Sequence, residues 1–237
     1  AFRWLRRAQR HALKLVQYSS SFSYGPPGTG KTTTLGVLLA EYLHLNPRAR
    51  VLLLSTTNHA VDQATVAVDK ALEQSKREAL SKTIKRLGSR FVASHYAGRE
   101  HLLPVHDKSL IKQLADIQAQ RPSDAKLAEL SLWKERVQAL EQKLLSQSLE
   151  VLRQNRLSCM TTTRAAFTLQ DLRTLPTFDL VVFDEASQVS LAHALALMPL
   201  GRSYLFAGDP QQLPRLFAVL PRWCSVGWGV HHSRKNL

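Results

Sequence analysis

The sequence predicts an α/β domain in which a mostly parallel sheet is flanked by helices. Short apolar runs alternate with segments of helical periodicity, which is typical of parallel strands joined by helical crossovers. Runs such as VLLLS and LVVF are apolar at successive positions, as expected for strands that are covered on both faces. Strands are expected over residues 21–24, 50–55, 157–161, 178–184 and 203–208.

A long segment between the second and third expected strands has a different texture. Apolar residues recur there at helical spacing on both sides of the breaker RPSD, residues 121–124. The two stripes predict an antiparallel helical hairpin, with Ser123 or Asp124 as N-cap of its second helix. The stripe residues are Leu110, Leu114 and Ile117, followed by Leu130, Trp133, Val137, Leu140 and Leu144. We therefore expect a core of residues 1–64 and 157–215, an inserted helical stalk of residues 65–156 and an irregular tail of residues 216–237.

The composition is strongly basic. The 237 residues include 32 Lys and Arg against 18 Asp and Glu, a formal net charge of +14, and most of the excess lies upstream of residue 158. Such a charge favours polyanionic partners, nucleic acid first and an anionic membrane surface second. No stretch approaches the roughly 20 apolar residues of a membrane span. Cys159 and Cys224 lack a CxxC partner, so we expect no zinc site and an intracellular compartment, cytoplasmic or nuclear.

The stretch GPPGTGKTT, residues 25–33, fits the phosphate-binding pattern G-x-x-x-x-G-K-[ST] and lies between a strand and an amphipathic helix. Gly28 and Gly30 let backbone N–H groups turn towards phosphate oxygens at the start of that helix. Lys31 is expected to reach the β- and γ-phosphates, and the hydroxyl of Thr32 to bind Mg²⁺. The expected nucleotide-binding residues of this loop are Gly25, Pro26, Pro27, Gly28, Thr29, Gly30, Lys31, Thr32 and Thr33.

Two further segments end strands at the same edge of the predicted sheet. LVVFDEASQ, residues 180–188, places Asp184 to hold the metal and Glu185 to act as the general base for the attacking water. GDPQQLP, residues 208–214, places Gln212 where its amide can contact the γ-phosphate. We therefore expect Lys31, Asp184, Glu185 and Gln212 to be catalytic, with Thr32 and Asp184 as the Mg²⁺ ligands.

In this order and spacing, GPPGTGKT, FDEASQ and GDPQQLP resemble the first RecA-like domain of superfamily 1 DNA and RNA helicases. The closer similarity is to the branch that includes the nonsense-mediated decay RNA helicase, senataxin and the flap-processing nuclease-helicase. LRRAQRHAL, residues 5–13, resembles the adenine-reading segment of the family, which assigns Gln9 to the adenine edge. The segments RLGS, residues 86–89, and MTTTRAAF, residues 160–167, are similar to those that flank the inserted stalk in the family.

The resemblance also implies contacts with single-stranded RNA or DNA. LSTTNHAVDQ, residues 54–63, is similar to the first nucleic-acid motif of the family. It assigns backbone contacts to Thr56, Thr57 and Asn58, and the later segment adds Thr162 and Thr163. These residue types are also ordinary helix caps, so a capping role is the alternative at each position.

The sequence departs from the family pattern towards its end. Arg215 stands where the family commonly has a second proline, and nothing after it resembles the motifs of a second RecA-like domain. In other P-loop enzymes an arginine finger contributes about 10³- to 10⁵-fold in rate. We therefore expect an ATP-binding helicase domain that is weak or inactive alone. The alternatives are an AAA-type remodelling ATPase and a non-catalytic nucleotide-dependent binding module.

Overall fold

The computed structural model describes residues 2, 4–26, 28–88, 90–104, 113, 116–122, 127–209 and 224–227. Its centre is a seven-stranded sheet of order β3-β4-β2-β5-β6-β1-β7, with every neighbouring pair parallel. The strands are β1 (Ser20–Tyr24), β2 (Val51–Ser55), β3 (Ile84–Arg86), β4 (Leu157–Thr161), β5 (Phe178–Phe183), β6 (Gly201–Gly208) and β7 (Cys224–Gly227). The expected α/β fold with a parallel sheet is confirmed.

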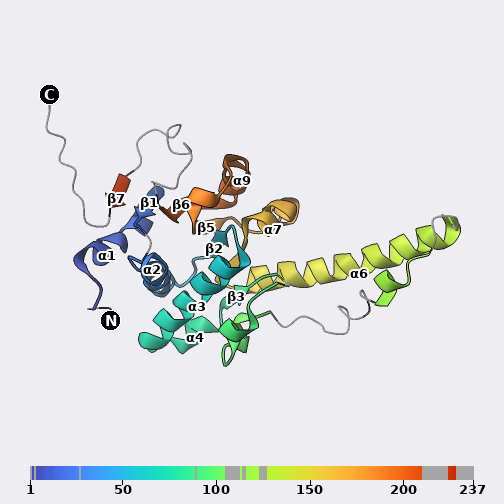
Figure 1. The fold of residues 1–237 in the computed structure, drawn as a ribbon, viewed down its shortest axis with the longest axis horizontal. Coiled ribbons are helices and arrows are strands. Elements are labelled where there is room, and N and C mark those ends of the chain that lie inside the picture. The colour runs from blue at the N-terminus through green and yellow to red at the C-terminus, as the bar shows by residue number, and fades with distance from the viewer. Residues whose placement is uncertain are drawn as a thin grey trace.

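Helices cover both faces of this sheet (Figure 1). They are α1 (Arg7–Ala12), α2 (Lys31–Leu45), α3 (Asn58–Gln74), α4 (Glu78–Ser81), α6 (Leu127–Gln154), α7 (Thr162–Phe167), α8 (Leu169–Arg173) and α9 (Leu191–Leu197). Short 3-10 turns are η1 (Leu15–Gln17), η2 (Ala93–Tyr96), η3 (Glu100–Leu102), η4 (Ala186–Gln188) and η5 (Met198–Leu200). None of these helices is both long enough and apolar enough to cross a membrane.

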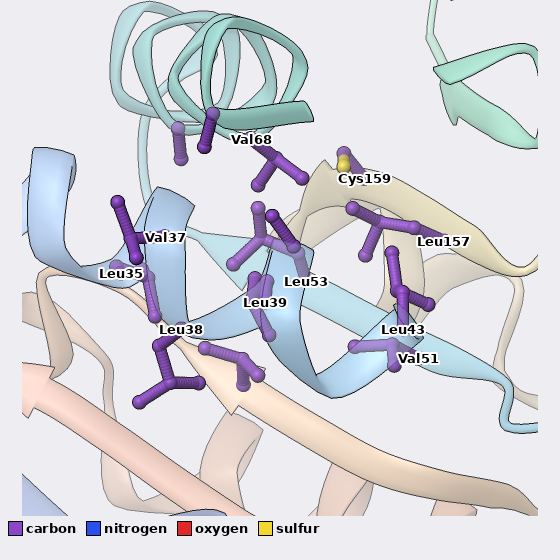
Figure 2. Packing of buried hydrophobic residues seen from close by; sticks show 14 of the residues in the cluster. Leu35, Val37, Leu38, Leu39, Leu43, Val51, Leu53, Val68, Leu157 and Cys159 are labelled. Carbon is purple, nitrogen blue, oxygen red and sulfur yellow. The ribbon is translucent and has the colours of Figure 1, made fainter. Parts of the chain in front are cut away.

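The alternating side chains of β2 explain why the sheet carries two hydrophobic cores. All five residues of β2 are buried. Val51 and Leu53 join the cluster formed with α2 and α3, which Figure 2 shows from close by. Leu52 and Leu54 point to the opposite face and join the cluster formed with α7, α8 and α9. A strand with both faces covered has no polar face, so the apolar run VLLLS is what this position requires.

Helices α2 and α3 pack against each other at closest range around Gly36. A Cβ atom on Gly36 would lie 2.6 Å from the backbone carbonyl of Ala67. The missing side chain therefore lets α3 approach α2 closely at this point.

The strand order places β6 between β1 and β5. In the register, Tyr24 of β1 aligns with Gly208 of β6, and Phe183 of β5 aligns with Phe206 of β6. The carboxyl ends of these strands therefore meet at one edge. The loops that follow them carry the expected phosphate-binding and acidic motifs.

The insertion contains a 28-residue helix, α6, which projects away from the sheet (Figure 1). Leu130 and Leu140 are its buried stripe residues, and the indole Nε1 of Trp133 donates to the carbonyl of Ile117 at 2.7 Å. Residues 116–119 are also helical, so two helical segments are in contact as the hairpin requires. The remaining expectations, at Leu110, Leu114, Ser123, Asp124 and the side chain of Leu144, lie outside the described residues.

Two boundaries differ from those expected. Residue 65, the expected start of the insertion, lies inside α3, and β3 then pairs with β4 at the edge of the sheet. The core thus extends to Arg86, because the buried face of α3 continues to Leu72. The tail, expected to be irregular, contributes β7, which pairs with β1. Neither short strand has an apolar run from which the sequence could predict it.

Candidate ATP site and nucleic-acid edge

The phosphate loop has the backbone that its glycines were expected to provide. Gly28 and Gly30 both have φ of 77°, in the left-handed region that favours glycine. Gly30 is the N-cap of α2, so the free N–H groups of the first turn of α2 face the loop. Thr29 closes a turn by donating its hydroxyl to the carbonyl of Pro26 at 2.8 Å. This geometry presents a concave set of donors to an anion.

Lys31 is the first residue of α2, and its side chain reaches back across the loop. Its ammonium donates to the carbonyl oxygens of Gly25 and Pro26, the second at 3.3 Å. Gly25 is itself tied to β6, because its N–H donates to the carbonyl of Gly208 at 3.2 Å. The positive charge of Lys31 is therefore already held at the mouth of the loop, where a phosphate oxygen can replace the two carbonyls.

Asp184 and Glu185 follow β5 at the same edge. Asp184 is 5% exposed, and its N–H donates to the carbonyl of Leu54 at 2.8 Å, which joins it to the end of β2. Burial raises the pKa of Asp184 to about 6, although the neighbouring Lys31 acts in the opposite direction. Glu185 has φ of 50°, a conformation that costs a non-glycine residue about 1 kcal/mol. Such local strain is typical of functional sites.

These residues surround an open cleft of about 620 Å³. Thr32, which was expected to bind the metal, lines it together with both glycines of the loop. The full lining is Pro26, Gly28, Gly30, Lys31, Thr32, Thr33, Gln63, Glu185, Ser187, Gln188, Gly208 and Asp209. The structure thus brings together the phosphate loop and Glu185, with Asp184 directly before it. Gln212 and Pro27 lie outside the described residues.

Gln9, expected at the adenine edge, packs beside this loop. It is 7% exposed, and its Nε2 would lie 3.3 Å from a Cβ atom on Gly30. Its Oε1 accepts from the N–H of Arg6 at 2.9 Å and so helps to cap α1. The side chain is therefore held next to the loop by its own helix.

A hydrogen bond links residues 54–63, the first segment expected to contact nucleic acid, to the acidic segment of residues 180–188. The hydroxyl of Thr56 donates to Oε1 of Gln188 at 3.1 Å, across 132 positions of the sequence. Gln188 ends the short turn η4, which starts directly after Glu185. Thr56 therefore links the end of β2 to the loop that carries the expected general base.

Thr57 and Asn58 occupy the start of α3. The hydroxyl oxygen of Thr57 accepts from the N–H of Ala60 at 3.1 Å, so Thr57 does cap the helix, and its side chain is exposed. Oδ1 of Asn58 accepts from Nη2 of Arg86 at 2.8 Å. Because a guanidinium only donates, this bond turns the Asn58 amide nitrogen away from Arg86.

Arg86 belongs to a buried network that sequence reasoning missed. Its Nε donates to Oδ1 of Asp62 at 2.8 Å, and the two side chains are 1% and 0% exposed. Asp62 also accepts from the hydroxyl of Tyr96 and the N–H of Val92, each at 2.8 Å. Two features of the sequence could have indicated this network: Asp62 on the apolar face of α3, and Arg86 in RLGS. The network fixes the segment that leads into the insertion against α3.

In residues 160–167, the second segment expected to contact nucleic acid, the two threonines expected to make contacts differ in exposure. Thr161 caps α7 by accepting from the N–H of Arg164 at 3.2 Å. Thr162 is 2% exposed, whereas Thr163 is exposed. Of the two residues expected to contact nucleic acid, only Thr163 therefore has an exposed side chain. Gln63 and Ser187, which line the cleft, were not singled out from the sequence, because their surroundings become visible only when α3 and η4 are placed side by side.

Comparisons with known proteins agree with this geometry. A family model described as an AAA domain matches residues 9–218. The Saccharomyces cerevisiae protein ECM32, which carries the name of an ATP-dependent RNA helicase, is 25% identical over 225 residues. The match covers 92% of this chain and 19% of that relative, so the chain spans about a fifth of the relative's length. With its phosphate loop, parallel sheet and acidic pair, the chain belongs to the AAA domain family and is an ATP-binding domain of the superfamily 1 helicase type.

Proposed function

We propose that this domain binds and hydrolyses Mg-ATP and, in the intact protein, couples hydrolysis to movement on single-stranded RNA or DNA. The observation that carries the proposal is the cleft in which Lys31, Thr32 and Glu185 converge. The relative that is named as an RNA helicase supports the same function. An AAA-type remodelling ATPase would also use a phosphate loop, and the helicase name of the relative favours the motor over that alternative.

The roles follow from where each side chain lies. The Lys31 ammonium exchanges its bonds to the carbonyls of Gly25 and Pro26 for bonds to phosphate oxygens. The backbone N–H groups at the start of α2 donate to the other phosphate oxygens. Glu185 accepts a proton from the water that attacks the γ-phosphate. Gln9 lies close enough to the loop to serve the adenine edge. Gln212 keeps its proposed role as γ-phosphate sensor on sequence grounds.

The residues also fit a magnesium ion. Asp184 is a buried carboxylate, and burial raises its pKa, so a cation beside it would stabilise its ionised form. Thr32 lines the cleft together with Glu185, the residue that follows Asp184. Oxygen ligands of this kind are those that Mg²⁺ prefers beside phosphates. When bound, the ion would neutralise charge on the phosphates, and Asp184 and Thr32 would hold it.

Nucleic acid would lie along the edge formed by Thr56, Thr57, Asn58 and Thr163. These side chains follow β2 and β4, which are neighbours in the sheet. The formal net charge of +14 supports a polyanionic partner. In the intact protein we expect a second RecA-like domain to supply an arginine finger, which in other P-loop enzymes raises the rate about 10³- to 10⁵-fold. An intracellular location, cytoplasmic or nuclear, stays a prediction.

ATP turnover by the purified chain, with and without single-stranded RNA or DNA, tests the proposal. Lys31→Ala should abolish ATP binding, because Lys31 is the only positively charged residue among the described residues that line the cleft. Glu185→Gln should retain ATP binding and lose turnover. Unchanged ATP affinity in the Lys31 variant would remove the phosphate site. Binding of ATP without turnover, in every condition, would favour the non-catalytic alternative.

A further inference from the structure

Phe167, the last residue of α7, exposes its ring to an unusual degree. It is 87% exposed, more than any other large hydrophobic side chain in the described part of the chain. Its helix neighbour Ala165 is fully buried against the sheet, so α7 is anchored by its inner face. The ring is therefore presented outwards by a fixed helix, at the edge where β4 ends.

The exposed ring has a polar neighbour on the same helix face. Thr163 and Phe167 are four positions apart, a spacing that brings side chains together on one face of a helix. Both are exposed. One exposed face of α7 thus carries a hydroxyl, which can contact a phosphate, and an aromatic ring, which can stack on a base.

Positive charge lies beside this pair. Arg164 packs next to Gly88, where its Cδ would be 3.8 Å from a Cβ atom. Among the residues that the structure describes, Arg164 forms no ion pair, whereas Arg86 nearby is paired with Asp62. Arg164 is thus a cation of α7 without an ion-pair partner in the described part of the chain, which favours an anionic ligand.

An apolar protein contact is the other explanation for the exposed ring. Leu191 and Leu195 of α9 are 43% and 55% exposed, and α9 packs beside α7 (Figure 1). Aliphatic side chains offer no face for stacking, and they do not explain why the exposed ring of Phe167 lies next to an exposed hydroxyl and a cation. The combination of these three groups on α7 favours a nucleotide.

We propose that Phe167 is a stacking platform for one base of a single-stranded nucleic acid, whose adjoining phosphate is held by Thr163 and Arg164. The inference rests on the proposed function, and it adds a base contact to the backbone contacts proposed above. Stacking on an aromatic ring is tolerant of sequence, since every base has a π-face. The platform would therefore hold the strand without selecting a sequence.

Fluorescence anisotropy of a labelled ten-nucleotide oligothymidylate, bound by the whole chain at low salt, tests the platform. Phe167→Ala should weaken binding by about 5- to 150-fold, the range for loss of one stacked base. Phe167→Tyr should bind as wild type, and so should the control Leu195→Ala. On an abasic strand of equal length, Phe167→Ala should match wild type. The salt dependence should fall by about one unit of slope in Arg164→Gln only.

The outcomes separate the inference from the proposed function. Equal binding of oligothymidylate by wild type and Phe167→Ala would overturn the platform and leave the proposed nucleic-acid binding intact. An equal loss in Leu195→Ala, or a loss by Phe167→Ala on the abasic strand, would also overturn it and would favour an apolar contact. Failure of wild type to bind either strand would overturn both the platform and nucleic-acid binding by this domain.

Discussion

Asp184 should make the empty domain less stable at neutral pH, so that replacing it by Asn stabilises the fold. Burial raises the pKa of this carboxyl from its usual 3.8 to about 6. Each tenfold change in proton affinity corresponds to about 1.4 kcal/mol, so holding Asp184 ionised costs about 3 kcal/mol. We expect Asp184→Asn, which has nearly the same shape and no charge, to gain about 1–3 kcal/mol at pH 7.5, because the amide also loses some hydrogen bonding.

The sign of the pH dependence follows from the raised pKa. Below about pH 4 the carboxyl is protonated in both the folded and the unfolded state, and the penalty is absent. Between about pH 4 and pH 6 the folded state binds more protons than the unfolded state, so the free energy of unfolding falls as pH rises. The advantage of Asp184→Asn should thus be about half as large at pH 5 as at pH 7.5.

Urea unfolding of both proteins at pH 5 and pH 7.5 measures this difference. Glu135→Gln on the exposed surface of α6 is the matched control, and we expect it to change the free energy of unfolding by less than about 0.5 kcal/mol. Adding Mg²⁺ and ATP should stabilise the wild type more than Asp184→Asn, since the variant lacks the proposed ligand. If Asp184→Asn is no more stable than wild type at pH 7.5, burial of the ionised Asp184 does not destabilise the fold as we expect.

Three further variants test the packing and the coupling of the site. Asp62→Asn leaves the buried guanidinium of Arg86 without its carboxylate, and we expect a loss of about 3–5 kcal/mol in urea unfolding. Gly36→Ala places a methyl group 2.6 Å from the backbone of α3, which should cost about 1–3 kcal/mol and lower the Tm. Thr56→Val removes the hydroxyl that donates to Gln188, and nucleic-acid stimulation of ATP turnover should fall by about 2- to 10-fold at unchanged ATP affinity.

The variants of Asp62 and Thr56 each have a control substitution that distinguishes loss of the contact from a general effect of mutation. Arg202→Gln breaks an exposed pair with Asp179 at 3.5 Å, and it should cost less than about 1 kcal/mol. Thr56→Ser keeps the donating hydroxyl and should retain stimulation. A loss of less than about 1 kcal/mol in the free energy of unfolding of Asp62→Asn would contradict the role of its bond to Arg86. An unchanged Tm in Gly36→Ala would contradict the close packing of α2 and α3. Equal nucleic-acid stimulation of ATP turnover in Thr56→Val and Thr56→Ser would contradict the role of the Thr56 hydroxyl.

The main strands and the phosphate loop were predictable because local sequence determines them. A strand covered on both faces must be apolar throughout, and the left-handed turns of the loop require glycine at positions 28 and 30. Motif order along the chain then predicted that the acidic pair would meet the loop. The strand order supplies the physical reason, since β6 is the single strand between β1 and β5.

The remaining features depend on partners that are distant in sequence. Arg86 is charged, which argues against a buried strand, and only the pairing with Asp62 makes β3 possible. The insertion was expected to begin at residue 65, which lies inside the uninterrupted helix α3. No helix-breaking residue there marks where the core ends. Gln188 was visible in the acidic motif, but its bond to Thr56 depends on η4 lying beside the end of β2.

The bond between Thr56 and Gln188 suggests how binding of a strand would influence hydrolysis. Thr56 follows β2 at the proposed nucleic-acid edge, and Gln188 ends the turn that begins after Glu185. Glu185 holds a left-handed conformation that an unconstrained residue would leave. A nucleic-acid strand that draws Thr56 towards its phosphates would therefore act on η4 through one hydrogen bond, and would shift Glu185, the proposed general base. Because this link is short and polar, we expect the coupling to respond to the Thr56 hydroxyl more than to the size of its side chain.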